Sequence, residues 1–364
     1  MLGPLGLIAS LCLLQAQSAV AHPADAESEP QFTVLAFNIL TSGNPPGPNA
    51  ASPLYRRSRQ QRIAEIILEV APDVVLVQEG SHARGVHDIL KEADPCWRMQ
   101  GGGDRGQMIL ARHELTPLGR NSARIKTPQG PVVVHNVHWE PYPYGPYECQ
   151  KRLLDGAATL DSAEILAASD KGEVYARTYR DIHPALLEGI PVVVGGDFNE
   201  PSHLDWTEEY LSKGADRWVS NPTEVPLKAV IPWKGSRLLS NPGAYSEELR
   251  LDPGQPLPPL VDCFRATRPS PVSDPGNTWT PAYSAETVDR RAFQASESLE
   301  ASEVQPTAVL DRIDMIYASA ALRPLEVVVL GDAGDPCSDR GFTPWPSDHR
   351  AVLARFAVGV PPEE

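Results

Sequence analysis

The sequence is poor in cysteine, in long apolar runs and in positive charge. Five of its 364 residues are Cys, and no two of them have the CxxC spacing of zinc sites and redox motifs. The apolar run from Leu5 to Leu14 is too short to span a bilayer. A formal net charge of −15 opposes broad electrostatic capture of nucleic acid, although a local basic patch could still exist. Thiolate zinc proteins, membrane-spanning proteins and tight DNA binders are therefore disfavoured.

The first 21 residues contain no Asp, Glu, Lys or Arg. Their apolar run suits a signal-peptide core, and Ala19-Val20-Ala21 offers the small-x-small pattern of a cleavage site. The absence of a basic residue near Met1 departs from the usual signal, and a free amino terminus supplies part of that charge. We therefore expect a signal peptide over residues 1–21, a flexible N-terminus over residues 22–31, and a secreted protein, extracellular or periplasmic. A buried N-terminal helix is the alternative.

Removal of that leader leaves four cysteines, Cys96, Cys149, Cys263 and Cys337. An even number in an exported chain predicts two disulfides, with a connectivity that the sequence leaves open. Free buried thiols are the alternative.

The composition, 41% hydrophobic and 22% charged, is that of a globular protein with a core. A repeat of apolar residues at i, i+3, i+4 and i+7 predicts a helix over residues 56–71, with its arginines on the solvent face. Twelve prolines between Pro222 and Pro281 predict loops there. We expect one domain of mixed α and β over residues 32–360. Further helices are predicted over residues 153–168 and 175–187, and strands over 32–38, 73–79, 132–139, 192–197, 309–318 and 350–358.

Single polar residues stand at the ends of most of these strands. Asp197 and Asn199 follow three valines and two glycines, and their i, i+2 spacing places both side chains on one side of an extended chain. A turn would explain that stretch alone. The pattern recurs at comparable positions, however, and burying so many polar groups without partners would cost several kcal/mol. We therefore expect these groups to meet: Asn38, Glu79, His138, Asp197 with Asn199, Asp314, and Ser347-Asp348-His349.

These polar residues lie in short motifs, which are, in order, "FNIL", "PDVVLVQE", "NVHW", "GGDFN", "RIDMIY" and "SDHRAV". The series resembles the successive motifs of the endonuclease/exonuclease/phosphatase superfamily, the deoxyribonuclease-I-like fold. "VDCFRAT" followed by "NTWTP" is similar to the stretch before the penultimate motif of that family. The resemblance covers Phe32 to Val358. It implies an α/β fold, a four-layer sandwich of two mixed β-sheets packed face to face with helices outside.

The resemblance also implies a divalent-metal phosphoesterase site at one end of the sandwich. A phosphodiester resists attack because its oxygens are negative, so a catalyst must neutralise charge and position a nucleophile. Asn38, Glu79 and Asp348 are carried over as metal-site residues. Hard oxygen donors suit Mg²⁺, with Mn²⁺ or Ca²⁺ as alternatives. The number of metal ions stays open.

Five further residues are carried over as catalytic. Asp314 is expected to hold one nitrogen of His349, which leaves the other nitrogen to take a proton from water or to hold a phosphoryl oxygen. Asp197 would orient or deprotonate the water, and Asn199 would donate a hydrogen bond to the phosphate. His138 would protonate the leaving oxygen. The division of acid and base among Asp197, His138 and His349 stays open.

Residues outside these motifs are further candidates for substrate contact. His203 and Asp205 would line the pocket or cap a helix. Lys234 and Arg237 would meet an anionic substrate or be ordinary surface charge. Trp279 is expected in the core rather than as a stacking platform.

The sequence thus predicts a secreted, divalent-metal-dependent phosphoester hydrolase. A phosphodiesterase acting on nucleic acid, a lipid head group or another small diester comes first. A phosphomonoesterase on a small phosphorylated metabolite is one alternative, and a non-catalytic binding protein on the same fold is another. The expected partner is a phosphate-ester substrate, with nucleic acid disfavoured by the charge, and the chain is expected to be monomeric without a transmembrane segment.

Overall fold

The computed structural model describes residues 31–40, 59–213, 217–218, 225–226, 229–279 and 311–358. The expected signal peptide and nearly all of the expected flexible N-terminus lie outside the described residues. No helix within the described ranges is long and apolar enough to cross a membrane.

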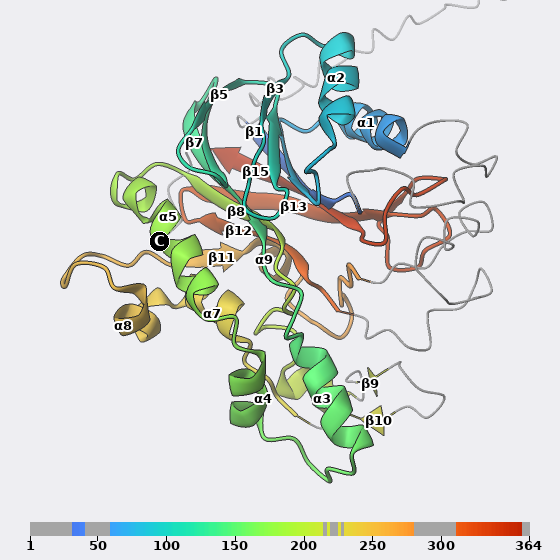
Figure 1. The fold of residues 1–364 in the computed structure, drawn as a ribbon, viewed down its shortest axis with the longest axis vertical. Helices are drawn as coiled ribbons and strands as arrows, with labels where there is room; N and C mark the ends of the chain where they lie inside the picture. The colour runs from blue at the N-terminus through green and yellow to red at the C-terminus, as the bar shows by residue number, and fades with distance from the viewer. Residues whose placement is uncertain are drawn as a thin grey trace, which may run out of the picture.

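Seven strands form one mixed sheet (Figure 1). In spatial order they are β14 (Arg340–Gly341), β13 (Leu322–Gly331), β15 (Ala351–Val358), β1 (Gln31–Asn38), β2 (Val74–Gln78), β4 (Met108–Ala111) and β3 (Arg98–Gln100). The predicted N-terminal strand, β1, is central, parallel to β2 and antiparallel to β15. Strands from the two ends of the chain therefore pair directly.

Six strands form a second mixed sheet. In spatial order they are β11 (Leu260–Asp262), β12 (Asp314–Ser319), β8 (Val192–Asp197), β7 (Gly130–His138), β6 (Ser122–Thr127) and β5 (Glu114–Pro117). The only parallel pair in this sheet among the described strands is β7 with β8. The long connection between β7 and β8 carries the helices that a parallel crossover needs.

The two sheets pack face to face, and helices cover both outer faces (Figure 1). Side chains such as Val34, Leu76, Val134 and Val193 fill the space between the sheets. The outer face of the seven-stranded sheet packs against α1 (Arg59–Val70) and α2 (Arg84–Ala93). The outer face of the other sheet packs against α5 (Glu173–Leu187), α7 (Lys234–Ser240) and α8 (Ser246–Leu249). This is the four-layer sandwich that the sequence predicted.

Helix α1 has the predicted apolar stripe but an unexpected buried arginine. Ile63 and Ile67 are fully buried. The prediction that the arginines face solvent is wrong for Arg59, whose side chain is 1% exposed. Its guanidinium donates to the carbonyl oxygens of Ile39 at 2.8 Å and Pro346 at 2.7 Å. Carbonyl groups from two loops therefore take the place of water around this cation.

A small extension stands beside the sandwich (Figure 1). It contains α3 (Gly145–Leu154), α4 (Ser162–Ser169), β9 (Arg217–Trp218) and β10 (Val225–Pro226), with an apolar cluster that includes Trp206 and Trp233. The single helix predicted over residues 153–168 is wrong. The chain leaves α3 through Gly156, whose φ is +96°, and Asp161 then caps α4 by accepting from the backbone N of Ala163 at 2.8 Å.

The proline-rich segment forms short elements, as its composition predicts. Its described helices have at most seven residues. Beside α7 and α8 it contains η4 (Pro242–Tyr245) and α9 (Cys263–Thr267), and α6 (Glu208–Ser212) precedes it.

The two predicted disulfides are wrong, because Cys96, Cys149, Cys263 and Cys337 are all free. Cys149 is buried in the extension, whereas Cys263 is buried between the sheets. Cys96 is exposed after α2, and Cys337 lies in the loop between β13 and β14. Burial raises the pKa of Cys149 to about 12, which keeps that thiol protonated. Different layers of the fold separate these thiols, which an even count could not reveal.

Candidate active site

Strand register brings the predicted polar residues to one end of the sandwich. In the parallel pair of β7 and β8, His138 lies opposite Asp197. The antiparallel β12 places Asp314 opposite the same aspartate. In the other sheet, β1 ends at Asn38 beside the end of β2. Strands of both sheets therefore supply side chains to one site.

Unusual backbone conformations occur where these strands end. Gly196 has φ +137°, and a Cβ atom there would lie 2.0 Å from the carbonyl oxygen of Val137, so only glycine fits between β8 and β7. Glu79 has φ +57° and Asn199 has φ +48°. Left-handed backbone in a residue other than glycine costs about 1–3 kcal/mol and is typical of functional sites. The polar residues that follow β2 and β8, Glu79 and Asn199, are therefore held in a strained backbone conformation.

Asp197 is the centre of the site and is 1% exposed. Its Oδ2 accepts from Nδ2 of Asn38 at 3.0 Å and from Nδ2 of Asn199 at 3.1 Å. Its Oδ1 accepts from the backbone N of Asn199 at 2.8 Å. The Nε2 atoms of His138 and His349 lie 3.8 and 3.9 Å from Oδ2. Two imidazole rings therefore flank one firmly oriented carboxylate.

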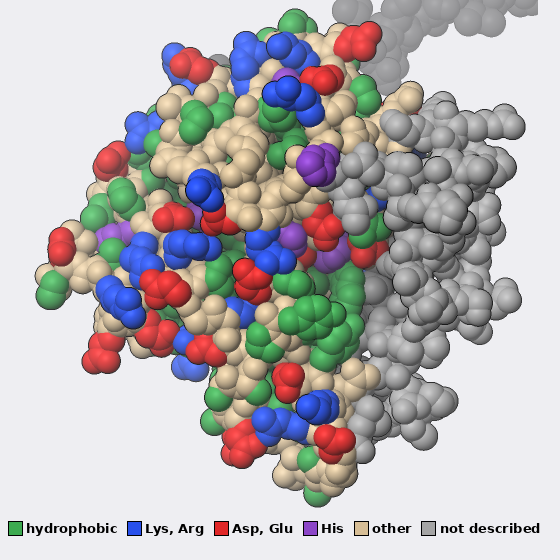
Figure 2. Space-filling view, in the orientation of Figure 1, with side chains coloured by type: hydrophobic (Ala, Val, Ile, Leu, Met, Phe, Trp, Pro, Cys, Tyr) green, Lys and Arg blue, Asp and Glu red, His purple; other side chains and the backbone are tan. Residues whose placement is uncertain are grey.

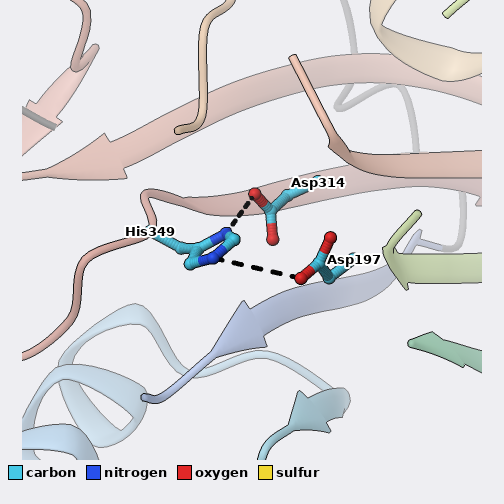
Figure 3. Close-up of side chains that lie close together, drawn as sticks. All are labelled: Asp197, Asp314 and His349. Carbon is cyan, nitrogen blue, oxygen red and sulfur yellow. Dashed lines mark hydrogen bonds and ion pairs between the residues drawn. The ribbon is translucent and has the colours of Figure 1, made fainter. Parts of the chain in front are cut away.

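His349 and Asp314 form the predicted pair (Figure 3), with 2.9 Å between Nδ1 and Oδ2. Because an ionised carboxylate only accepts hydrogen bonds, Nδ1 carries the hydrogen and Nε2 faces Asp197. Burial alone would lower the pKa of His349, but the carboxylates of Asp314 and Asp197 outweigh it and hold that pKa well above its ordinary value. The ring therefore carries a positive charge at neutral pH.

His138 is fixed by a backbone carbonyl instead. Its Nδ1 lies 3.1 Å from the carbonyl oxygen of Arg105. A carbonyl oxygen can only accept, so Nδ1 bears a hydrogen. The second nitrogen, Nε2, is left on the side of Asp197, where it can exchange a proton with a group in the site.

Asn38, Glu79 and Asp348 form the corner of the site that the sequence assigned to a metal ion. Nδ2 of Asn38 lies 3.4 Å from Oε1 of Glu79. Oδ1 of Asp348 is buried, and no donor of the described residues reaches it. Burial raises the pKa of Asp348, and the negative charge of Glu79 raises it further. Two neighbouring carboxylates with an orphaned buried oxygen fit a hard divalent cation such as Mg²⁺.

A second set of potential ligand atoms belongs to Asp197, Asp314 and His349 (Figure 3). These atoms all lie within 4.8 Å of one another. Nδ1 of His349 and Oδ2 of Asp314 already bind each other, and Asp197 already accepts three hydrogen bonds. This set is therefore better suited to proton transfer and phosphate contact than to metal ligation.

The site lines a cavity of about 570 Å³. Figure 2 shows histidine and acidic side chains together near the centre of this face. Arg105 is the only Lys or Arg of the described residues that line the cavity. Trp279 lies half-buried in the wall with its ring 6.3 Å from that of His349, so its prediction as a core residue is wrong. The lining residues are Glu79, Ser81, His82, Arg105, His138, Pro141, Asp197, Asn199, Trp279, Asp348 and His349.

Three candidates for substrate contact lie elsewhere. Lys234, on α7, forms ion pairs with Asp170 at 2.9 Å and Glu248 at 2.8 Å. Arg237 is exposed on the same helix. Nδ1 of His203 lies 3.1 Å from the hydroxyl of a serine on α7. None of these three lines the cavity described above, so the structure does not bring them to the candidate site.

Asp205 is neither a pocket residue of this site nor a helix cap. Thr207 caps α6 by accepting from the backbone N of Tyr210 at 3.4 Å. Asp205 instead accepts from Arg265 at 2.8 Å and from Arg312 at 2.9 Å in a buried ion cluster.

Sequence reasoning missed Arg105, which shapes the site, and it grouped Ser347 with the motif residues without giving it a task. Arg105 belongs to no motif, although Gly101–Gly103 and Gly106 around it signal a loop that approaches other backbone closely. The hydroxyl of Ser347 donates to the carbonyl oxygen of Asn38 at 2.6 Å and accepts from the backbone N of His349 at 3.2 Å. It thereby ties the His349 loop to the end of β1.

Comparison with known proteins agrees with this geometry. A family model described as "Endonuclease/Exonuclease/phosphatase family" matches residues 35–349. The chain belongs to this family. Uncharacterized protein F14F9.5 of Caenorhabditis elegans is 29% identical over 344 residues, which cover 89% of this chain and 90% of that protein. Family membership and the site together make a phosphoester hydrolase the supported class of function.

Solved structures of the family are also similar. An AP endonuclease from Archaeoglobus fulgidus has 16% sequence identity and a TM-score of 0.45, with 90% of this chain and 100% of that chain covered. TDP2 from Caenorhabditis elegans has 15% identity and a TM-score of 0.42, with 90% and 75% covered.

Proposed function

We propose that this protein is a secreted phosphodiesterase that requires a divalent metal ion. The observation that carries the proposal is the cavity in which two imidazoles flank the oriented carboxylate of Asp197. Next to them stands a pair of acidic side chains with an orphaned buried oxygen. Such a site has room for a cation, a water molecule and a phosphoryl group. Secretion rests on the uncharged leader of residues 1–21 alone.

Glu79 and Asp348, with Asn38 beside them, would hold the metal ion. A divalent ion bound there neutralises negative charge on phosphoryl oxygens and stabilises the charge that develops during displacement. Activation of the water, contact with the phosphoryl oxygens and protonation of the leaving oxygen are carried out by side chains of the protein.

Asp197 and His349 have complementary tasks. Asp197 is held by Asn38 and Asn199, so its Oδ2 can orient the attacking water and accept the proton of that water. His349 is a cation, and its Nε2–H can donate to a phosphoryl oxygen as negative charge grows there. Asp314 keeps the ring in that orientation.

His138 and Arg105 serve the other side of the phosphate. With Nδ1–H bound to the Arg105 carbonyl, the doubly protonated ring of His138 would give its Nε2 proton to the leaving oxygen and return to the neutral form. The Arg105 guanidinium pairs with Glu140, whose side chain is 50% exposed. Exposed ion pairs contribute little, about 0–1 kcal/mol, so a phosphate oxygen can replace Glu140 at small cost.

A diester fits this cavity better than a monoester for an electrostatic reason. Glu79, Asp197 and Asp348 line the cavity, and only Arg105 of the described lining residues is a Lys or Arg. A dianionic monoester would add a second negative charge to this acidic site, whereas a diester carries one. A cavity of about 570 Å³ also has room for a substituent on each side of the phosphorus.

The test is turnover by the purified chain with Mg²⁺ against bis(p-nitrophenyl) phosphate, p-nitrophenyl phosphate, plasmid DNA and sphingomyelin. The diester should exceed the monoester in kcat/KM by about tenfold or more, which corresponds to about 1.4 kcal/mol. Chelation should abolish turnover, and Mg²⁺ should restore it. Faster monoester turnover would instead establish a phosphomonoesterase, and no turnover of any ester would favour a binding protein.

Secretion needs its own measurement. Mass spectrometry of exported protein should find an N-terminus near His22. A protein that retains Met1 would contradict the proposed leader.

A further inference from the structure

Lys171 lies behind the candidate site, in the turn between α4 and α5. Its Nζ donates to the carbonyl oxygen of Asn199 at 2.6 Å and also to the carbonyl oxygen of Glu140. Asn199 follows β8, and Glu140 follows β7, two residues after His138. One ammonium group therefore joins the two loops that carry His138 and Asn199.

The same two loops meet at a second point, on the cavity side. Nδ2 of Asn199 donates to the carbonyl oxygen of Trp139 at 3.1 Å and to Oδ2 of Asp197 at 3.1 Å. Asn199 has φ +48°, so its peptide needs external support to stay in this strained conformation. Lys171 supplies that support from behind, at the carbonyl group of the strained residue.

We propose that Lys171 is a positioning residue whose ammonium group holds the loops after β7 and β8 in the catalytic geometry, so that turnover falls when this group loses its proton. The proposal rests on the phosphoesterase function proposed above. Lys171 does not line the cavity and acts only through Asn199 and the segment after His138.

The surroundings of Lys171 lower the pKa of its ammonium group, so that the group loses its proton in mildly alkaline solution. Burial lowers the pKa of Lys171 to about 8. Arg105 lowers this pKa as well, whereas the carboxylates of Glu200, Asp197 and Glu140 oppose the shift. An ammonium group makes charge-assisted hydrogen bonds about twice as strong as those of a neutral amine, so deprotonation weakens both carbonyl contacts.

Two further neighbours of Lys171 are a tyrosine and an aspartate. The hydroxyl of Tyr175 accepts from the backbone N of Lys171 at 3.4 Å, and burial raises the pKa of Tyr175 well above its ordinary value. Asp170, the preceding residue, is paired with Lys234. The Tyr175 hydroxyl therefore does not ionise near pH 8. His349, whose pKa is also raised, is a second group whose proton loss would lower turnover, and the Lys171→Arg variant separates the two because it leaves His349 in place.

Activity and stability should respond to pH in opposite directions through this group. Turnover falls as pH rises through about 8, where the folded protein loses the ammonium proton. An unfolded lysine keeps its proton to its ordinary pKa of 10.5. Between these values the unfolded state binds more protons, so the contribution of Lys171 to stability rises with pH. Loss of turnover above pH 8 would therefore not reflect unfolding caused by this residue.

The experiment measures kcat and KM for diester hydrolysis with Mg²⁺ from pH 6.5 to 9.5. It compares the wild type with Lys171→Arg, Lys171→Met and a control, Lys126→Met, which removes an exposed lysine paired with Glu114. Lys171→Met should lower kcat about tenfold or more at pH 7 and leave KM within about threefold. The wild type and the control should lose kcat with a midpoint near pH 8. Lys171→Arg should lack this midpoint, because guanidinium stays protonated.

A midpoint that persists in Lys171→Arg, or a kcat of Lys171→Met equal to that of the wild type, would overturn the proposal. A second readout does not depend on turnover or on the folding of the Met variant. In protein labelled with ¹⁵N-asparagine, the side-chain amide signal of Asn199 should shift with a midpoint near pH 8 in the wild type and not in Lys171→Arg. Absence of that shift would overturn the positioning role even if no ester proves to be a substrate. A present shift with no turnover would count against the proposed function alone.

Discussion

Two buried polar clusters adjoin the start of β12. The open cluster lines the cavity of about 570 Å³, whereas the closed cluster borders a space of only about 10 Å³. In the closed cluster, Nη2 of Arg312 lies 2.9 Å from Oδ1 of Asp205 and 2.7 Å from Oδ2 of Asp262. Arg265 adds a contact of 2.8 Å to Asp205. Every one of the carboxylates in this cluster therefore has a guanidinium partner within the chain.

The open cluster is compensated only in part, because one imidazolium, that of His349, pairs with Asp314 and also faces Asp197. Oδ1 of Asp314 and Oδ1 of Asp348 are buried and meet no donor of the described residues. Burial raises the pKa of both carboxyls. In the closed cluster burial acts in the same way on Asp262, but Arg312 outweighs it and holds the pKa below its ordinary value. Both clusters are almost fully buried, so burial does not distinguish the site. The incomplete pairing of its carboxylates within the chain distinguishes the site, because unpaired oxygen atoms can bind a ligand from outside.

The largest expected effect on turnover comes from Asp197→Asn in the open cluster. Loss of the oriented carboxylate should lower kcat about 10²–10⁴-fold, the usual range for a general base. The free energy of unfolding should fall by at most about 1–3 kcal/mol, because one amide group would then face the donors of Asn38 and Asn199. Steady-state kinetics and urea unfolding of the same preparation measure both quantities.

The matched substitution in the closed cluster is Asp262→Asn. It should show the reverse pattern, with a clear loss of stability and near-normal kcat per folded molecule. Asp197→Asn with normal turnover, or Asp262→Asn with turnover as low as that of Asp197→Asn, would end the distinction between the clusters.

Arg312→Met should have the largest effect on stability. It leaves Asp205 and Asp262 buried without their common cation, and breaking such a network costs about 3–5 kcal/mol. Arg268→Met is the control. The guanidinium groups of Arg312 and Arg268 lie 5.2 and 5.1 Å from the same Phe264 ring, but Arg268 is 26% exposed. Its loss should cost about 1 kcal/mol or less in urea unfolding at pH 7. Equal losses for the two variants would contradict the argument.

The comparison of the clusters also shows how far sequence reasoning reaches. Asp314 and His349 were correctly paired, and this prediction came from the resemblance of their motifs to those of the family. Strand periodicity predicted that polar residues at strand ends, such as Asn38, His138 and Asp197, would meet. Alternation within a strand determines the face on which a side chain lies. The order of the motifs, through the family that they resemble, predicts the fold that brings the strands together.

Partnerships between distant side chains could not be predicted in this way. The carbonyl oxygen of Pro346 that binds Arg59 is 287 positions away along the chain, so nothing local in the sequence distinguishes this arginine from the other arginines of the predicted helix. Lys234 was a candidate either for substrate contact or for ordinary surface charge. In the structure Asp170, the residue after α4, and Glu248 of α8 neutralise it. The predicted disulfides failed for the same reason, because an even count contains no distances.

A metal ion should stabilise the open cluster by supplying the missing charge. At about 100 times its dissociation constant, Mg²⁺ would raise the free energy of unfolding by about 2.7 kcal/mol. Asp348→Asn should abolish most of this gain. In chelator the variant should melt slightly above the wild type, because a neutral amide replaces a carboxylate whose pKa is raised chiefly by its burial. Thermal melts of both proteins in chelator and in Mg²⁺ test this. An Mg²⁺ shift of unchanged size in Asp348→Asn would place the ion elsewhere.

The smallest expected effect concerns Asp311, a buried acid that has hydrogen bonds but no cationic partner among the described residues. Its Oδ2 accepts from the hydroxyl of Tyr144 at 2.6 Å, and its Oδ1 accepts from Nε1 of Trp206 at 3.3 Å. Burial raises its pKa to about 7 in the folded protein, from an ordinary value of 3.8. The hydrogen bonds that Asp311 accepts from neutral groups therefore offset only part of the cost of burying its charge. The charge of Arg312 offsets that cost fully for Asp262.

The sign of the resulting pH dependence follows from linkage. A raised folded pKa gives a stability contribution that is complete below 3.8 and is lost as pH rises through about 7. Asp311→Asn cannot ionise, and its amide can still accept from Trp206 while the Tyr144 hydroxyl turns to accept in exchange. Relative to the wild type, the variant should therefore gain stability between pH 5 and pH 8. Urea unfolding at both pH values measures this difference, and parallel pH dependences for the two proteins would show that Asp311 ionises normally despite its burial.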